Sequence, residues 1–199
     1  MDQLLAQRRQ KDEFFKSNPY SPLTPEQQAR FNGLRYYDPN PALVLDLSPE
    51  AFTDKADFRM QTSTGDLRSY QRWGKVRFQV EGQDAELTLY YLPSDDSFFV
   101  PFMDATSGTE TYGAGRYIDA RRLPDGRIHL DFNEAYSPYC AYNEPPQLAA
   151  AAGREAEPWS CPIPPRENRL KIPIRAGEKS PEGDWVIQDY ESYPGQDEA

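Results

Sequence analysis

The sequence predicts a mainly β fold: an antiparallel β-sandwich or partly closed β-barrel with one or two N-terminal helices and a long Pro-rich C-terminal wrap. One observation behind this prediction is that apolar and polar residues alternate from residue 43 onward, as they do in strands with one buried face. Turn sequences such as EGQD and LPDG separate these runs. The chain also holds 13 Tyr and 10 Phe residues, whose large rings suit strands and supply core area.

The length of 199 residues fits one compact domain, which would bury about 70% of the surface that its unfolded chain exposes. We therefore expect a single domain over residues 1–199. Its expected parts are a helical N-terminal extension (1–33), an antiparallel β core (43–132) and an irregular Pro-rich wrap (133–199).

The N-terminal extension predicts a helix over residues 3–17, which are rich in Gln, Arg, Lys, Glu and Leu. Leu4 and Phe15 stand at the two ends of one thin apolar face, so this helix is expected to lie across the body of the protein.

A second, shorter helix is indicated by its boundary residues. Thr24 is a candidate N-cap, Pro25 suits the first helical position, and Gln27 completes a capping box. Gly33 is the predicted stop.

The β core predicts two hairpins. Alternating residues 76–80 and 87–91 flank the EGQD turn, and FFVPF (98–102) then forms a short, fully apolar run. The second hairpin turns at residues 124–126, where Gly126 tolerates a positive φ.

The register of the second hairpin follows from pairing apolar residues with each other. If Leu123 faces Arg127, the polar face carries His129 beside two carboxylates, Asp119 and Asp131. In full, the predicted pairs are Leu123 with Arg127, Ala120 with Leu130, Ile118 with Phe132, Tyr117 with Asn133, Asp119 with Asp131, and Arg121 with His129.

Two Asp residues opposite each other repel, so something should offset their charge. Arg116 and Arg121 could act as counter-charges, a cation could bind, or Asp119 and Asp131 could share one proton. An exposed ladder of Arg and Asp side chains is the plain structural alternative. His129 next to an Asp also permits a proton relay, but no Gly-x-Ser-x-Gly elbow supplies a nucleophile.

Residues 104–117 carry Gly108, Gly113 and Gly115 and then Arg116, a bidentate donor. Glycines that aim backbone N–H groups in one direction, followed by an Arg, can hold a carboxylate or a phosphate. The segment is not a P-loop, because Gly-Lys-Ser and Gly-Lys-Thr are missing. A connection whose hydroxyls satisfy its own turns is the alternative.

The wrap is broken by prolines and predicts little regular structure apart from an edge strand around Ile172 and an Ala-rich turn or two within 145–158. Cys140 and Cys161 bracket that Ala-rich stretch. They are too few for a disulfide framework or a structural zinc site, so two reduced, buried thiols are expected. We predict no metal and no cofactor.

A formal net charge of −10 and a sequence pI near 4.7 disfavour a nucleic-acid partner, because binding phosphates needs a basic face. An anionic membrane surface would also repel the chain. No run resembles a signal peptide or a membrane span, so we expect a cytoplasmic protein.

Several linked motifs follow one another along the chain: KDEFF, SPLTPEQQARFNGLRYY, TSTGDLRSYQRWG, FVPFMDATSGTETYGAGRY, LDFNEAYSPYCAY and CPIPPRENRLKIPIRAGEK. In this order they resemble the mostly bacterial and archaeal family catalogued as domain of unknown function 1684. The resemblance runs from about Lys11 to Lys179, with Ser137 where the family more often has Asn and a longer stretch between the two cysteines. It implies no activity, but its motifs include polar positions that a fold alone does not require: Thr111, Tyr112, Arg116, Asp131, Asn133 and Glu178.

These features lead to a first hypothesis, a protein that binds a small polar or anionic ligand between the 104–117 segment and the 115–133 hairpin. Arg116 would anchor the anion. A second hypothesis is a structural or protein-interaction module in which the same groups form an internal network. A third is a hydrolase or isomerase with Asp131 or His129 as the base, and Asp119 as a further catalytic candidate. The predicted ligand-binding residues are Glu110, Thr111, Tyr112, Arg116, Asp131, Asn133 and Tyr136.

Overall fold

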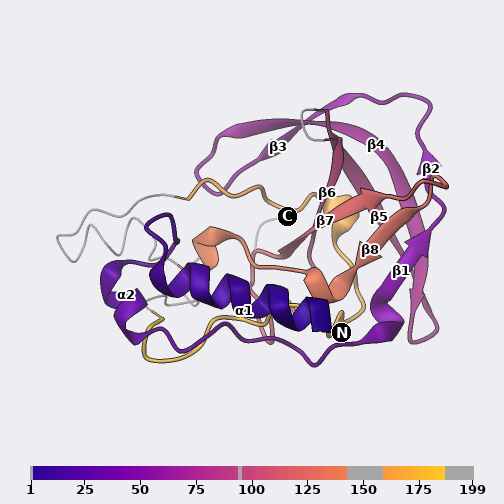
Figure 1. Cartoon of the computed structure of the whole chain (residues 1–199). Helices are drawn as coiled ribbons and strands as arrows, with labels where there is room; N and C mark the ends of the chain where they lie inside the picture. Colours follow the sequence, from indigo (N-terminus) through magenta and orange to yellow (C-terminus); the bar gives the residue numbers. More distant parts are fainter. Residues whose placement is uncertain (1, 94–95, 143–158, 187–199) are drawn as a thin grey trace.

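A computed structural model describes residues 2–93, 96–142 and 159–186 (Figure 1). Within them, antiparallel strands form one sheet in the order β1-β8-β7-β6-β5-β4-β2, and β3 also pairs with β4. The sheet curls into a half-barrel, which confirms the mainly antiparallel β prediction in its partly closed form. The strands are β1 (Val44–Leu47), β2 (Glu50–Ala51), β3 (Asp57–Gln61), β4 (Leu67–Val80), β5 (Gln83–Leu92), β6 (Ser97–Phe102), β7 (Arg116–Arg122) and β8 (Ile128–Asp131).

Helix α1 (Asp2–Ser17) lies across the body, as its thin apolar face predicts (Figure 1). Phe15 is its buried side chain. Helix α2 (Pro25–Arg30) has the predicted capping box, in which the Thr24 hydroxyl accepts from the Gln27 N–H and the Gln27 side chain accepts from the Thr24 N–H. The predicted stop at Gly33 is wrong, because the helix already ends at Arg30, with Phe31 as an extended C-cap.

The first hairpin is confirmed as the β4–β5 pair, in which Val80 pairs with Gln83 around the predicted turn. The FFVPF run belongs to β6 and is buried on both faces of the sheet. Phe98 and Val100 pack inside the half-barrel, whereas Phe99 packs on the opposite face against Tyr70 and Tyr117. Burial on both faces explains why this run is apolar throughout rather than alternating.

Apolar side chains gather in three clusters. The largest fills the half-barrel with fully buried side chains such as Val76, Leu87 and Leu130. Another lies under the helices around Phe15 and Trp185. The third covers the outer face of the sheet. Helix α1, whose Phe15 belongs to the second cluster, therefore packs on a layer separate from the main core.

The second hairpin has the predicted turn and the predicted Arg121–His129 pair. The predicted Leu123–Arg127 pair is also confirmed, since the Leu123 N–H donates to the Arg127 carbonyl. The predicted pairs beyond Arg121–His129 are wrong. The β7–β8 ladder holds two residue pairs, after which β7 pairs with β6 and β8 pairs with β1. A short 3-10 turn, η2 (Phe132–Glu134), carries the chain away from β8, and Tyr117 bridges to Tyr136 instead. Asp119 and Asp131 are therefore not paired.

Residues 159–186 contain no strand, so the edge strand predicted around Ile172 is wrong. These residues are held by scattered hydrogen bonds: the Ala105 N–H donates to the Ile172 carbonyl, and the Tyr37 N–H donates to the Gly177 carbonyl. The Ala-rich turn predicted within 145–158 lies outside the described residues. None of the described helices has the length and apolar character that crossing a membrane requires.

Candidate functional site

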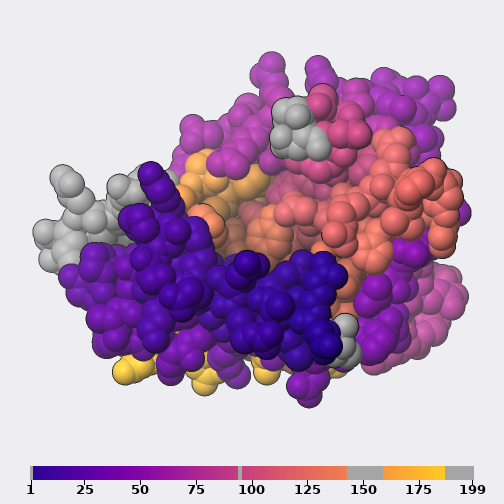
Figure 2. All heavy atoms as spheres, in the orientation of Figure 1, coloured from indigo at the N-terminus to yellow at the C-terminus, as the bar shows by residue number. Residues whose placement is uncertain are grey.

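A cavity of about 240 Å³ opens between α1 and the β7–η2 region of the sheet. Figure 2 shows this face hollowed between the indigo helix and the orange strands. The cavity is smaller than the roughly 300–1,000 Å³ of sites for drug-sized ligands, so its size suits a small metabolite. Its lining is mostly polar and charged: Leu4, Gln7, Arg8, Lys11, Tyr36, Asp119, Asn133, Glu134, Ala135, Tyr136 and Glu178.

The helical wall of the cavity comes from one stripe of α1. Leu4, Arg8, Lys11 and Phe15 follow the i, i+4, i+7, i+11 spacing that places side chains on one helix face. Phe15 anchors this stripe in the cluster under the helices, and the two cations between its apolar ends face the cavity.

Among the residues that the structure describes, no carboxylate pairs with Arg8. Its guanidinium lies 4.3 Å over the Tyr36 ring and donates to the carbonyls of Tyr37, at 3.0 Å, and Asn133, at 3.4 Å. Burial lowers the pKa of Arg8, and the carboxylate of Glu178 opposes this only from a longer range. The buried Nε of Arg8 and the buried hydroxyl of Tyr36 have no hydrogen-bond partner among the described residues.

Lys11 and Glu178 form the paired part of the cavity. The Lys11 ammonium contacts the Glu178 carboxylate and lies 5.1 Å from the centre of the Tyr136 ring. Glu178 is buried, and its other oxygen accepts from the Ser137 N–H at 2.8 Å and from the Tyr142 hydroxyl at 2.5 Å. Both Glu178 oxygens are thus occupied by protein donors.

Asp119 forms the opposite wall with Tyr136. The Tyr136 hydroxyl donates to the Asp119 carboxylate at 3.0 Å. The Asp119 side chain reaches solvent, but partial desolvation still raises the pKa of its carboxyl above the usual value. Lys11 lowers this pKa only from a longer range, and no cation forms an ion pair with Asp119 within the described residues.

Of the predicted ligand-binding residues, Asn133 and Tyr136 line this cavity, together with the catalytic candidate Asp119. Asn133 is mostly engaged with the protein, because its side chain exchanges hydrogen bonds with the backbone of Asn40 and donates to Asp131. Tyr136 and Asp119 are therefore the predicted residues most open to a ligand.

Arg116 lies elsewhere, at the centre of a buried network. Its guanidinium is 1% exposed and pairs with Asp104 at 2.9 Å. It also donates to the backbone carbonyls of Ile174, Ala176 and Glu178. These protein acceptors leave no room for the predicted anion-anchoring role, and the partner is Asp104 rather than a residue of the hairpin.

The rest of the 104–117 segment is also turned inward. Asp104 accepts from the Thr106 N–H and hydroxyl, and the Thr106 and Thr111 hydroxyls lie 2.9 Å apart. Tyr112 is buried. Glu110 is instead at the surface, where Arg175 binds it in a bidentate ion pair. This segment fastens the C-terminal residues 170–178 to the sheet and does not line the cavity.

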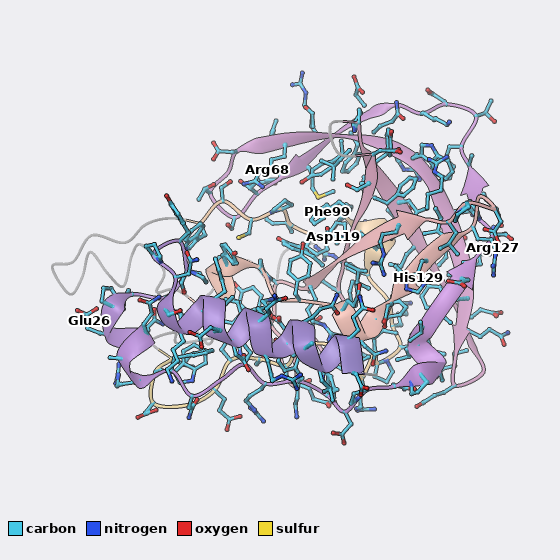
Figure 3. All side chains as sticks on the ribbon, viewed as in Figure 1. Glu26, Arg68, Phe99, Asp119, Arg127 and His129 are labelled. Carbon is cyan, nitrogen blue, oxygen red and sulfur yellow. The ribbon has the colours of Figure 1, made fainter. Side chains whose placement is uncertain are left out.

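The other catalytic candidates also lie outside the cavity. The His129 Nδ1 lies 2.7 Å from the Asp46 carboxylate on the neighbouring strand β1. Asp131 caps η2 by accepting from the Asn133 N–H at 2.8 Å. Figure 3 shows Asp119 near the middle of the molecule and His129 farther along the sheet, toward Arg127 in the β7–β8 turn.

Cys140 and Cys161 are not joined by a disulfide, and their thiols hydrogen-bond to each other. The Cys140 thiol lowers the pKa of Cys161 to about 7, while the same contact and burial raise the pKa of Cys140 well above its usual value. Neither cysteine lines the cavity. Within residues 2–93, 96–142 and 159–186, no three His, Cys, Asp or Glu side chains are grouped so that they could hold a metal ion.

Sequence reasoning missed Arg8, Lys11, Tyr36 and Glu178 as members of one site. A signal for two of them was present, since Arg8 and Lys11 interrupt the stripe between Leu4 and Phe15. Tyr36 and Glu178 could not be joined from the sequence, because an isolated bridge brings them together across 142 positions of the chain.

Comparison with known proteins shows the family of this chain. The sequence model of the protein family of unknown function DUF1684 matches residues 29–179. The chain is similar to an uncharacterised protein of Haloarcula marismortui, known from a solution NMR structure, with 34% identity and a TM-score of 0.64. That similarity covers 89% of this chain and 92% of the other. No curated protein matches the chain significantly.

Proposed function

Because the chain belongs to the DUF1684 family, a family of unknown function, we propose a function from the geometry of the cavity: it binds a small ligand that carries an anionic oxygen group. The observation that carries this proposal is Arg8, a desolvated guanidinium with an unsatisfied Nε and no paired carboxylate among the described residues. Leaving a buried donor unsatisfied costs about 1–3 kcal/mol, and more when it is charged. An anionic oxygen at Arg8 would remove that cost.

The Tyr36 hydroxyl supports the same assignment. It lines the cavity, is buried and lacks a partner, so it can donate to the same class of ligand. Burial raises the pKa of Tyr36, so the hydroxyl keeps its proton and remains a donor. A planar guanidinium and a hydroxyl are common donors for carboxylate and phosphate groups.

The test is isothermal titration of the full chain with sodium phosphate, acetate and lactate. Arg8→Met should weaken the binding of whichever anion binds by about tenfold or more, because the charge-assisted contact is lost. Arg9→Met is the matched control, since Arg9 is the exposed neighbour on the same helix. Tyr36→Phe keeps the ring beneath Arg8 and removes only the hydroxyl.

Equal binding by the Arg8→Met and Arg9→Met variants would overturn the assignment, as would a panel in which nothing binds. Circular dichroism of each variant separates loss of binding from loss of the fold. If Arg8→Met does not fold, Tyr36→Phe still decides, because it should weaken binding without unfolding the protein.

A further inference from the structure

The charged groups of the cavity do not all pair with one another. Lys11 pairs with Glu178, and Glu178 is also saturated by Ser137 and Tyr142. Glu134 also lines the cavity, and its carboxylate lies 3.8 Å from the guanidinium of Arg121, which does not line it.

This pairing leaves one cation and one anion of the cavity without a partner of opposite charge among the described residues. The cation is Arg8, whose hydrogen bonds go to backbone carbonyls. The anion is Asp119, which accepts a hydrogen bond from the neutral Tyr136 hydroxyl. Both line the cavity, but no ion pair joins them.

The two walls are separate structural elements. Arg8 belongs to α1, and Asp119 belongs to β7 in the middle of the sheet. Figure 3 places Asp119 above α1, and both Asp119 and Arg8 line the cavity. A ligand in this space would meet a positive group on one side and a negative group on the other.

The ionised form of Asp119 is also disfavoured by its surroundings. Desolvation works against its ionised form, and the Tyr136 hydroxyl offsets this only in part. A protonated amine placed against Asp119 would supply the missing counter-charge and would lower the pKa of the carboxyl toward its usual value.

We propose that the ligand is a small zwitterion, with its oxyacid group at Arg8 and its protonated amine at Asp119. A free amino acid has this chemistry. The inference rests on the proposed anion site at Arg8 and adds a second, independent contact on the opposite wall. The cavity size restricts the ligand to the smaller members of the class.

The test pairs each zwitterion with the acid that lacks its amine. Glycine, β-alanine and 4-aminobutyrate are titrated calorimetrically into the full chain beside acetate, propionate and butyrate, and aspartate and glutamate beside succinate and glutarate. The expected result is that at least one zwitterion binds about tenfold or more tightly than its matched acid. The spacing of its two charges then reports the distance across the cavity.

Asp119→Asn removes the charge and keeps an oxygen that can accept from Tyr136. In this variant the preference for the zwitterion should fall to less than about threefold, while the matched acid binds as before. Asp125→Asn is the control, because Asp125 lies in the β7–β8 turn and pairs with Arg127. It should leave the preference intact.

Failure of this inference is distinguishable from failure of the anion site. If acids bind as tightly as their zwitterions and Arg8→Met abolishes both, the anion site stands and the zwitterion assignment is overturned. If Asp119→Asn keeps the full preference, Asp119 is not the amine-binding group, and the assignment is also overturned. If neither kind of compound binds, both proposals fall.

Discussion

Two arginines illustrate how the surroundings of a residue decide its role. Arg116 is predicted from the sequence to anchor an anion, and Arg8 is part of a helix with no assigned role. In the structure Arg116 is enclosed by Asp104 and backbone carbonyls. Arg8 instead lines a cavity, and its buried Nε has no hydrogen-bond partner among the described residues. A guanidinium is available to a ligand only where the protein has not already filled its donors.

The buried Asp104–Arg116 pair makes a strong prediction about stability. Arg116→Ala should lower the free energy of unfolding by about 3–5 kcal/mol, because it leaves the Asp104 carboxylate buried without its cation. Urea denaturation followed by circular dichroism measures this change. Arg127→Ala, which removes an exposed Arg from the β7–β8 turn, is the control and should leave the midpoint unchanged within error. Similar midpoints for the two variants would contradict the structural role of Arg116.

Asp119 predicts a stability change of the opposite sign. A carboxyl whose pKa is raised in the folded state favours the fold while it is protonated and loses that contribution as the pH rises. Asp119→Asn should therefore raise the melting temperature at neutral pH, by about 1–3 °C, and should have no effect near pH 3. Differential scanning calorimetry across this range is the measurement.

The control for Asp119 is Asp125, because Arg127 lowers the pKa of the Asp125 carboxyl. Asp125→Asn should leave the melting temperature at neutral pH unchanged or slightly lower. A drop in stability at neutral pH for Asp119→Asn would mean that Asp119 stabilises the fold, against the argument from its raised pKa.

At the scale of elements, the C-terminal segment (residues 170–178) contains no strand, yet it closes one side of the cavity. It reaches the sheet through Arg116 and reaches η2 through Gly177, then places Glu178 beneath Lys11. Gly177 has φ +76°, and a Cβ there would lie 2.5 Å from the Ala135 carbonyl oxygen. This close approach fixes the backbone next to the cavity.

Replacing Gly177 tests that close approach. Gly177→Ala should destabilise the protein by about 3 kcal/mol or more, because it combines a left-handed backbone conformation with a clash against backbone atoms. Gly108→Ala is the matched control, since Gly108 has φ +83° and open space around it. It should cost only the conformational part, about 1–2 kcal/mol. Equal unfolding free energies for the two variants would show that the backbone near Ala135 shifts easily to make room for the added Cβ.

Helix α1 is the other element that closes the cavity. Its sequence predicted that it lies across the body, but not that its side chains line a cavity. The capping box of α2 and the two-residue period of β4 and β5 were likewise readable, because each depends on neighbours close in the chain. The predicted β7–β8 pairs beyond Arg121–His129 failed because η2 carries the chain away from β8, and Tyr117 bridges to Tyr136 instead.

For the whole molecule, the layering of the core implies unequal local stability. The sheet carries the main core, whereas α1 buries Phe15 on a separate cluster. The backbone amides of α1 should therefore exchange with deuterium at least about tenfold faster than the slowest amides of β5 and β6, because α1 can open without unfolding the sheet. Hydrogen exchange followed by mass spectrometry measures this difference. Equal protection of helix and strands would mean that α1 opens only when the whole protein unfolds.

The sequence by itself determined the antiparallel β class, the two helices and the turns of both hairpins. Periodicity and turn chemistry act over a few neighbouring residues and are written directly in the chain. Its family resemblance was also readable from linked motifs, and the family match over residues 29–179 confirms it.

Only the tertiary structure decided which polar residues pair with other protein groups and which line a cavity. Arg116 and Asp104 form a buried ion pair, whereas Arg8 and Asp119 both line the cavity and do not pair with each other. Both pairs have the same chemistry in the sequence. The two pairs differ because burial and ion pairing depend on contacts between elements far apart in the chain. A local sequence pattern does not show whether a charged side chain forms an ion pair.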